Sequence, residues 1–186
     1  MRIAPAACLL ACLACAHPAP ATPAAAATDC APTSRSTLPG VAIAVGGPCR
    51  FTLAQARAGL RFPYEVRIEQ DVDGVAPTPQ GSGGCGEPGD SGLIVFGRID
   101  GGGQSYCLCD TGLCPDRERV PGKLPRGRYA GTFEWDGMSW NGPSDTGQPK
   151  GAPFPPGTYT LTLSAVGGYG TGNFEVVGTY QITLVP

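Results

Sequence analysis

Nine cysteines give this sequence its widest range of chemistry, because thiols can be oxidised, bound to metals or acylated. Three of them lie within the first 15 residues, and the other six are Cys30, Cys49, Cys85, Cys107, Cys109 and Cys114. An even number of cysteines in a chain that begins like a secreted protein favours disulfides, so we expect three bridges. Sequence does not fix their connectivity, and local loop closure favours the pairs Cys30–Cys49, Cys85–Cys107 and Cys109–Cys114.

Cys107, Cys109 and Cys114 are close enough in sequence to be considered as a zinc or soft-metal site. No histidine lies near them, and no second Cys-x-x-Cys pair completes a ligand set. Disulfides are therefore the preferred state, and we expect no metal and no cofactor. A metal or redox protein that uses these three thiols stays as an alternative function, and it requires the thiols to be free.

Residues 89–92, Gly-Asp-Ser-Gly, match the nucleophile motif of chymotrypsin-like serine proteases. That chemistry needs a histidine to accept the serine proton. The one histidine, His17, lies outside the expected folded domain, so a Gly-rich turn is the preferred interpretation. Glu134 and Asp136 are a second candidate pair, but one is expected on a strand exterior and the other in a turn. We therefore expect no catalytic residues and no enzyme activity.

Charged residues are few and nearly balanced. The chain has 13 basic and 15 acidic side chains, which gives a formal net charge of −2 at pH 7. No basic patch interleaved with aromatic residues is present in the sequence. Nucleic acid is therefore not an expected partner.

Residues 1–15 carry one early positive charge and then an apolar run, the layout of a secretory signal and too short for a membrane-spanning helix. The run contains Leu-Leu-Ala-Cys ending at Cys12 and Cys-Leu-Ala-Cys ending at Cys15, and both resemble the lipobox of bacterial lipoproteins. The resemblance implies acylation, at Cys15 by preference and at Cys12 as the alternative. It also implies a lipid anchor in a bacterial cell envelope, on the outer membrane or in the periplasm. An ordinary cleaved signal, which would give a secreted protein, is the other interpretation.

Residues 16–35 are dominated by Ala, Pro and Thr and contain too little large apolar surface to fold, so we expect an extended tether. Residues 36–186 are then expected to form a single domain. Short apolar segments separated by Gly and Pro indicate an all-β fold with long loops at residues 74–92 and 110–127. A capping box from Thr52 to Gln55 predicts a short connecting helix before Gly59.

Alternating apolar and polar residues predict the strands of this domain. The two clearest alternating segments are residues 128–135 and 158–165. We expect other strands at residues 41–45, 64–68, 93–99, 104–109 and 174–185. Residues 155–158, Pro-Pro-Gly-Thr, predict a type II turn ahead of a strand, with Gly157 at positive φ. Gly178 is expected to form a bulge in the last strand.

Trp-Asp-Gly at residues 135–137, Gly147, and Pro-Gly-Thr-Tyr-Thr at residues 156–160 form a pattern that resembles the immunoglobulin-like domain of flagellar hook-capping (FlgD-type) proteins. A similar pattern occurs in BsuPI-type proteinase inhibitor domains. The resemblance covers residues 126–186, with a longer insertion before the turn. It implies an Ig-like β-sandwich, and the second family adds a proteinase inhibitor as an alternative function. Many activities share this fold, so the resemblance implies no reaction.

Three residues are candidates for recognition: Trp140, Asn141 and Tyr169. A long loop that carries such residues on a rigid sandwich is a common place for binding. The competing expectation is that Trp140 folds back over the sheet edge. The sequence as a whole therefore predicts a lipid-anchored, disulfide-stabilised β-sandwich that acts as a non-enzymatic binding or structural module for an unknown protein or glycan.

Overall fold

The computed structural model describes residues 30–78, 88–107, 120–140 and 150–186. These residues form eleven strands and one short helix. In chain order the elements are β1 Thr33–Ser36, β2 Val41–Val45, β3 Arg50–Thr52, α1 Leu53–Ala58, β4 Leu60–Ile68, β5 Val72–Thr78, β6 Phe96–Gly101, β7 Gln104–Cys107, β8 Gly122–Leu124, β9 Gly127–Trp135, β10 Gly157–Tyr169 and β11 Gly172–Val185. The prediction of an all-β sandwich with a short connecting helix is confirmed.

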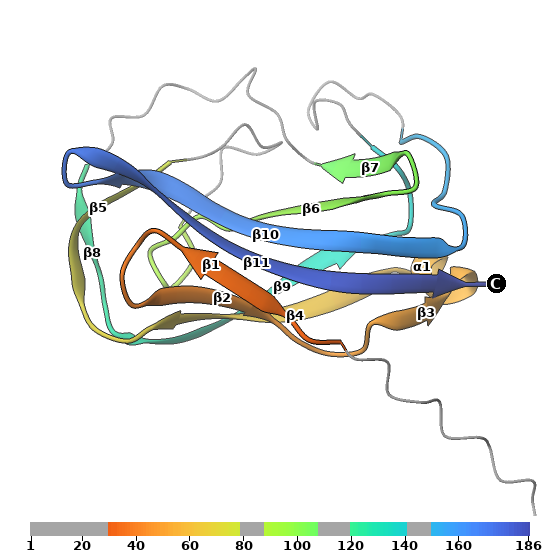
Figure 1. The fold of residues 1–186 in the computed structure, drawn as a ribbon, viewed down its shortest axis with the longest axis horizontal. Coiled ribbons are helices and arrows are strands. Elements are labelled where there is room, and N and C mark those ends of the chain that lie inside the picture. Colours follow the sequence, from red (N-terminus) through yellow and green to blue (C-terminus); the bar gives the residue numbers. More distant parts are fainter. Residues whose placement is uncertain (1–29, 79–87, 108–119, 141–149) are drawn as a thin grey trace, which may run out of the picture.

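Two sheets make up the sandwich, and the larger is built on the β10–β11 hairpin, which runs the length of the molecule (Figure 1). The first half of β10 pairs with β6, which pairs in turn with β7, and the second half of β10 pairs with β5, which pairs with β8. On the other side, β11 pairs with β1 and, near its end, with β3 in parallel. The small sheet is antiparallel and has the order β2-β4-β9.

The core lies between the two sheets and follows the alternation that the sequence predicts. In β10 the side chains of Tyr159, Leu161, Leu163 and Ala165 are buried, and the residues between them face outward. In β9 the alternation is also present, and it ends at Trp135, which is buried. Each fully buried large apolar side chain contributes about 1.5–3 kcal/mol, so β10, together with Trp135 at the end of β9, supplies much of the driving force for folding.

The helix α1 begins and ends where its sequence signals predict. The side chain of Thr52 accepts a hydrogen bond from the backbone N–H of Gln55, and the side chain of Gln55 accepts one from the N–H of Thr52. Gly59 ends the helix with φ at 98°, a conformation that costs glycine little. Ala56 packs into the core, so the helix closes one end of the sandwich.

Two predictions about glycines are wrong. Gly178 causes no bulge, because β11 keeps its register with β10 across this position. A Cβ at Gly178 would lie 2.6 Å from the carbonyl oxygen of Ile43 on the opposite sheet, so the glycine permits close contact between sheets. Gly157 has no positive φ and begins β10, so the expected type II turn does not form. Instead, the hydroxyl of Tyr159 donates to the carbonyl oxygen of Pro155 at 2.6 Å.

Several strand boundaries also differ from expectation. Residues 33–36, at the predicted end of the tether, form β1 against β11. Residues 72–78 form β5, although the long loop was expected to begin at residue 74. β8 lies within the segment expected to be irregular. The strand expected from residue 93 begins at Phe96. The remaining parts of the two expected loops are mostly outside the described residues.

Candidate functional site

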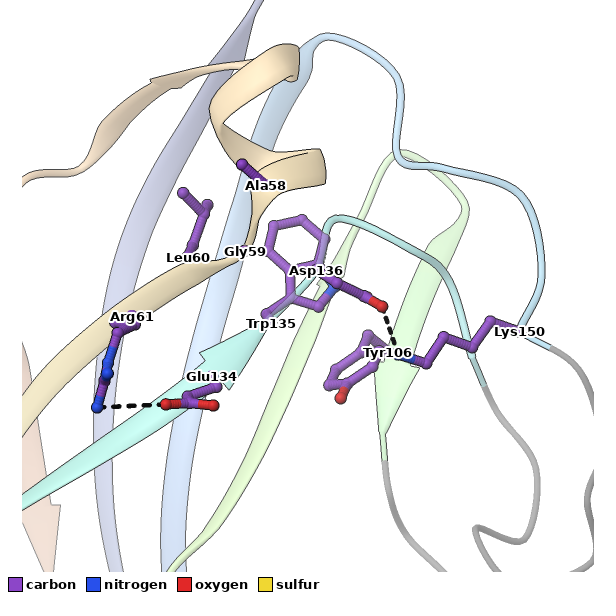
Figure 2. Close-up of a pocket in the computed structure, with 9 residues that line it drawn as sticks. All are labelled: Ala58, Gly59, Leu60, Arg61, Tyr106, Glu134, Trp135, Asp136 and Lys150. Atoms are coloured by element: carbon purple, nitrogen blue, oxygen red, sulfur yellow. Dashed lines mark hydrogen bonds and ion pairs between the residues drawn. The ribbon is translucent and has the colours of Figure 1, made fainter.

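A cavity of about 400 Å³ lies at the end of the sandwich that α1 closes (Figure 2). We call it the α1 corner. It is formed where the start of β4 and the end of β9 meet β7 from the other sheet, and its lining residues are Ala58, Gly59, Leu60, Arg61, Tyr106, Glu134, Trp135, Asp136 and Lys150. Its volume is within the usual range for sites that bind small ligands.

The Trp-Asp-Gly motif builds one wall of the α1 corner. The indole Nε1 of Trp135 donates to the carbonyl oxygen of Met138 at 3.0 Å, and Oδ1 of Asp136 accepts from the N–H of Met138 at 3.2 Å. Gly137 has φ of 75°, and a Cβ there would lie 3.1 Å from Ala56. The motif therefore makes a tight turn that sits directly against α1, which fixes Trp135 and Asp136 relative to the helix.

Two ion pairs stand on opposite sides of the cavity (Figure 2). Nη2 of Arg61 lies 3.3 Å from Oε1 of Glu134, and Nζ of Lys150 pairs with Oδ2 of Asp136. All four side chains are at least one-third exposed, so each pair contributes at most about 1 kcal/mol and is easily rearranged. The corner thus offers two cationic donors and two anionic acceptors, with no net formal charge, to a polar ligand.

Tyr106 and Trp135 form the aromatic part of the cavity and belong mainly to the core. Their exposed fractions are 5% and 2%, and Trp135 packs against Phe154 with ring centroids 4.8 Å apart. Burial raises the pKa of the Tyr106 phenol, and the negative charge of Asp136 raises it further. The phenol is therefore neutral at ordinary pH and keeps its proton to donate. Because little ring surface is open, polar contacts would dominate binding here.

Glu134 and Asp136 both line the cavity, but each has a different cation as its partner. Glu134 extends from β9 and Asp136 belongs to the turn after it, as expected from the sequence. The sequence prediction missed Arg61, Lys150 and Tyr106. Arg61 lies opposite Glu134 in the β4–β9 register, so it could have been found once that pairing was predicted.

Ser91 of the Gly-Asp-Ser-Gly motif has a structural role. Its side chain is buried, and its Oγ accepts a hydrogen bond from the N–H of Leu93 at 3.2 Å. Gly92 has φ of 79°, which the turn requires. This turn borders a second, smaller cavity of about 190 Å³ between β9 and the segment that precedes β6. His17 lies outside the described residues. The motif is therefore a turn, as the preferred interpretation predicted.

The cysteines that the structure describes are all oxidised. Cys30 and Cys49 form a disulfide with their Cα atoms 5.8 Å apart, which confirms the first predicted bridge. Cys107 is also disulfide-bonded. The metal or redox alternative requires a free thiol at Cys107, whereas this cysteine is oxidised in the structure. The remaining candidates, Cys12, Cys15, Cys85, Cys109 and Cys114, lie outside the described residues.

Trp140 extends the large sheet. Its N–H donates to the carbonyl oxygen of Ser105 at 2.9 Å, and its own carbonyl oxygen accepts from the N–H of Cys107 at 2.8 Å. The indole packs partly buried against the core, although its Nε1 has no hydrogen-bond partner in the described part of the chain. Trp140 therefore covers the edge of β7, as the competing expectation had it.

Trp140 and Tyr169 do not form one recognition surface. Trp140 is level with Tyr106, and the strand registers place that row at Leu161 of β10. Tyr169 lies eight residues further along β10, about 26 Å away at the usual rise of a strand, and it is 37% exposed at the hairpin tip. Asn141 lies outside the described residues.

Comparisons with known proteins place no family name on the chain. No family model, no curated protein and no solved structure matches it. The resemblance to FlgD-type and BsuPI-type domains therefore stays a prediction from the motif. Within the four described ranges, no group of three or more His, Cys, Asp and Glu side chains is arranged to hold a metal ion, and no helix is long and apolar enough to cross a membrane.

Proposed function

We propose that this chain is an exported, lipid-anchored protein of the bacterial cell envelope that acts as a non-enzymatic binding module. The oxidised state of Cys30, Cys49 and Cys107 carries the proposal, because disulfides persist in oxidising compartments and are rare in the cytosol. The lipobox-like pattern before Cys15 supports an anchor, and the preceding residues resemble a signal.

The α1 corner supports a small ligand rich in hydroxyl groups, such as part of a glycan. Carboxylates of Glu134 and Asp136 accept hydrogen bonds from hydroxyls, and Arg61 and Lys150 donate to them. A neutral ligand would leave the balance of charge at the site unchanged. Since both ion pairs are exposed, their rearrangement would cost little of the binding energy.

Mass spectrometry of the membrane-extracted protein tests the anchor. We expect the mature N-terminus to be an acylated cysteine at residue 15. A Cys15→Ser variant should then lose the lipid and leave the membrane fraction, whereas acylation at Cys12 would leave that variant anchored. An unmodified N-terminus beyond residue 20 would contradict the anchoring proposal.

Isothermal calorimetry with a panel of neutral, anionic and cationic saccharides tests the binding site. We expect Glu134→Gln to weaken the binding of a neutral saccharide about tenfold, because it replaces a charged acceptor that a hydroxyl can use. Glu175→Gln, on the outer face of the large sheet, is the matched control and should bind as the unmodified protein does. Binding that is equal in both variants would remove the α1 corner as the site.

A further inference from the structure

Strand β9 forms one edge of the small sheet. Its nine residues pair with β4 along their whole length, and its other side carries no strand in the part of the chain that the structure describes. An open edge presents a row of backbone N–H and C=O groups that can pair with another strand. With nine residues, β9 presents a long row of such backbone groups.

Other edges of the sandwich are short or covered. β2, the other edge of the small sheet, has five residues, β1 has four, and β3 and β8 have three each. The free side of β7 is capped by Trp140. Proteins usually protect an edge with proline, lysine or a bulge. β9 has neither proline nor lysine, and its register with β4 is unbroken. Within the described residues, the protection of β9 is limited to the charges of Arg128 and Glu134 and to the segment before β6, which lines a cavity with Tyr129 and Ala130. No strand pairs with this side of β9 in the described part of the chain.

The sequence of β9 is complementary to itself when it is reversed. Arg128 and Glu134 each lie three positions from Gly131, and Ala130 and Thr132 each lie one position from it. Two antiparallel copies of β9 with Gly131 opposite Gly131 would therefore place Arg128 directly opposite Glu134, twice. Cross-strand pairs of opposite charge stabilise a sheet, whereas like charges in these positions destabilise it.

The neighbouring charges favour the same arrangement. Arg128 now lies 3.2 Å from Glu65, and Glu134 lies 3.3 Å from Arg61, and both β9 side chains are about two-thirds exposed or more. In the paired state each Glu134 would have Arg61 of its own chain on one side and Arg128 of the second chain on the other. The new contact would therefore add a cation to each Glu134, and Glu65 would keep Arg67 as a partner if Arg128 turns toward the second chain.

The inward face of β9 offers an apolar pair as well. Tyr129 and Phe133 each lie two positions from Gly131, and both are only partly buried in the core. In the reversed pairing Tyr129 would lie opposite Phe133 of the second chain, and aromatic cross-strand pairs are favourable. At the centre, the ring of Tyr64 occupies the space over Gly131, where a Cβ would lie 2.2 Å from it. Gly131 therefore leaves room for the Tyr64 ring and adds no side chain of its own at the centre of the β9 edge.

We propose that two copies of this chain pair through β9 in the antiparallel direction, with Gly131 on the twofold axis. The two small sheets would then join into one continuous six-stranded sheet. This interface is isologous, so it closes at a dimer and does not lead to fibres. The α1 corner would be present twice in the assembly, once near each end of the paired β9 strands.

A charge-exchange series on the full mature protein tests the dimer, with its mass measured by sedimentation equilibrium in density-matched detergent. The unmodified protein should dimerise with rising concentration. Arg128→Glu places a carboxylate opposite each Glu134 and should raise the dissociation constant at least about tenfold, and Glu134→Arg should do the same by placing arginines opposite each other. The combined variant restores opposite charges and should dimerise within about threefold of the unmodified protein.

Arg98→Glu, on the outer face of the large sheet, is the matched control and should leave the dissociation constant unchanged. Hydrogen exchange gives a second measurement: outward-facing amides of β9 should exchange more slowly in the dimer than in Arg128→Glu. A protein that stays monomeric at every concentration, or a dimer that Arg128→Glu does not weaken, would overturn the proposal. Failure of the combined variant to recover would do so as well.

Discussion

Helix α1 and the tip of the β10–β11 hairpin lie at opposite ends of the sandwich and are held in different ways (Figure 1). The α1 end depends on particular side chains: the Cys30–Cys49 disulfide, the capping box at Thr52 and the contact of Trp135 with Phe154. The hairpin end depends on the backbone ladder, which stays in register from Gly157 to Tyr169.

At the hairpin end, close backbone packing accompanies the contacts of buried side chains such as Phe174. A Cβ at Gly167 would lie 2.3 Å from the carbonyl oxygen of Ala76 on β5. At the α1 end, by contrast, a cavity is left open among charged side chains. A ladder of backbone hydrogen bonds tolerates many sequences, whereas a corner held by side chains requires certain ones. Substitutions should therefore have larger effects at the α1 end.

The largest effect is expected for Trp135→Ala. It removes a buried aromatic ring and its hydrogen bond to Met138, and it should lower the free energy of unfolding by about 3–5 kcal/mol. Urea unfolding measures this. Trp135→Phe keeps a ring against Phe154 and should lose clearly less. If the alanine variant loses less than about 1 kcal/mol, the α1 end does not depend on this side chain.

Removing the disulfide is expected to have the next largest effect. The Cys30→Ala, Cys49→Ala double variant should lower the free energy of unfolding by about 2–4 kcal/mol, because the bridge restricts the unfolded chain. Thermal unfolding of this variant, compared with the unmodified protein, measures the loss. A reducing agent should then have a smaller further effect on the variant than on the unmodified protein. Equal heat resistance of the two proteins would contradict the expectation.

A smaller loss is expected for Thr52→Ala, which removes one half of the capping box. The free energy of unfolding should fall by about 1 kcal/mol, because a backbone N–H of α1 loses its partner. Thr52→Ser keeps the hydroxyl and is the control, with a change within about 0.5 kcal/mol. An alanine variant that is as stable as the serine variant would show that the helix end is satisfied in another way.

The smallest effect is expected at the hairpin tip. Tyr169→Ala removes an exposed side chain, and it should change the free energy of unfolding by no more than about 0.5 kcal/mol. The same urea unfolding experiment measures it beside Trp135→Ala. If Tyr169→Ala lowers the free energy of unfolding nearly as much as Trp135→Ala does, both ends of the sandwich depend equally on side chains. The proposed difference between the two ends would then be wrong.

Sequence patterns predicted the elements whose own residues determine them. The alternation of β9 and β10 and the capping box of α1 are visible within a few residues, so their positions were predicted correctly. β1 has four exposed residues and no apolar side chain, and it is a strand only because β11 offers it a partner. β5 contains Gly74 and Pro77, which weaken the strand pattern, and Pro77 lies beyond the residues that pair with β8.

The site was harder to predict than the fold, because it depends on contacts between distant segments. Arg61, Tyr106 and Lys150 come together only when β4, β7 and the segment before β10 meet at one corner. Gly178 shows the same limit: a glycine inside a strand is consistent with a bulge or with a close approach of backbone, and only the position of Ile43 distinguishes the two.

The Cys30–Cys49 bridge also determines how the domain would respond to mechanical force. A pull on the chain ahead of Cys30 passes through the sulfur atoms to Cys49, whose carbonyl oxygen accepts from the N–H of Thr183 on β11. The load therefore enters the sandwich beside β3, and the loop between the two cysteines cannot lengthen. Because β1 lies within that loop, the force would not act on β1, and its hydrogen bonds to β11 would not be pulled apart one after another.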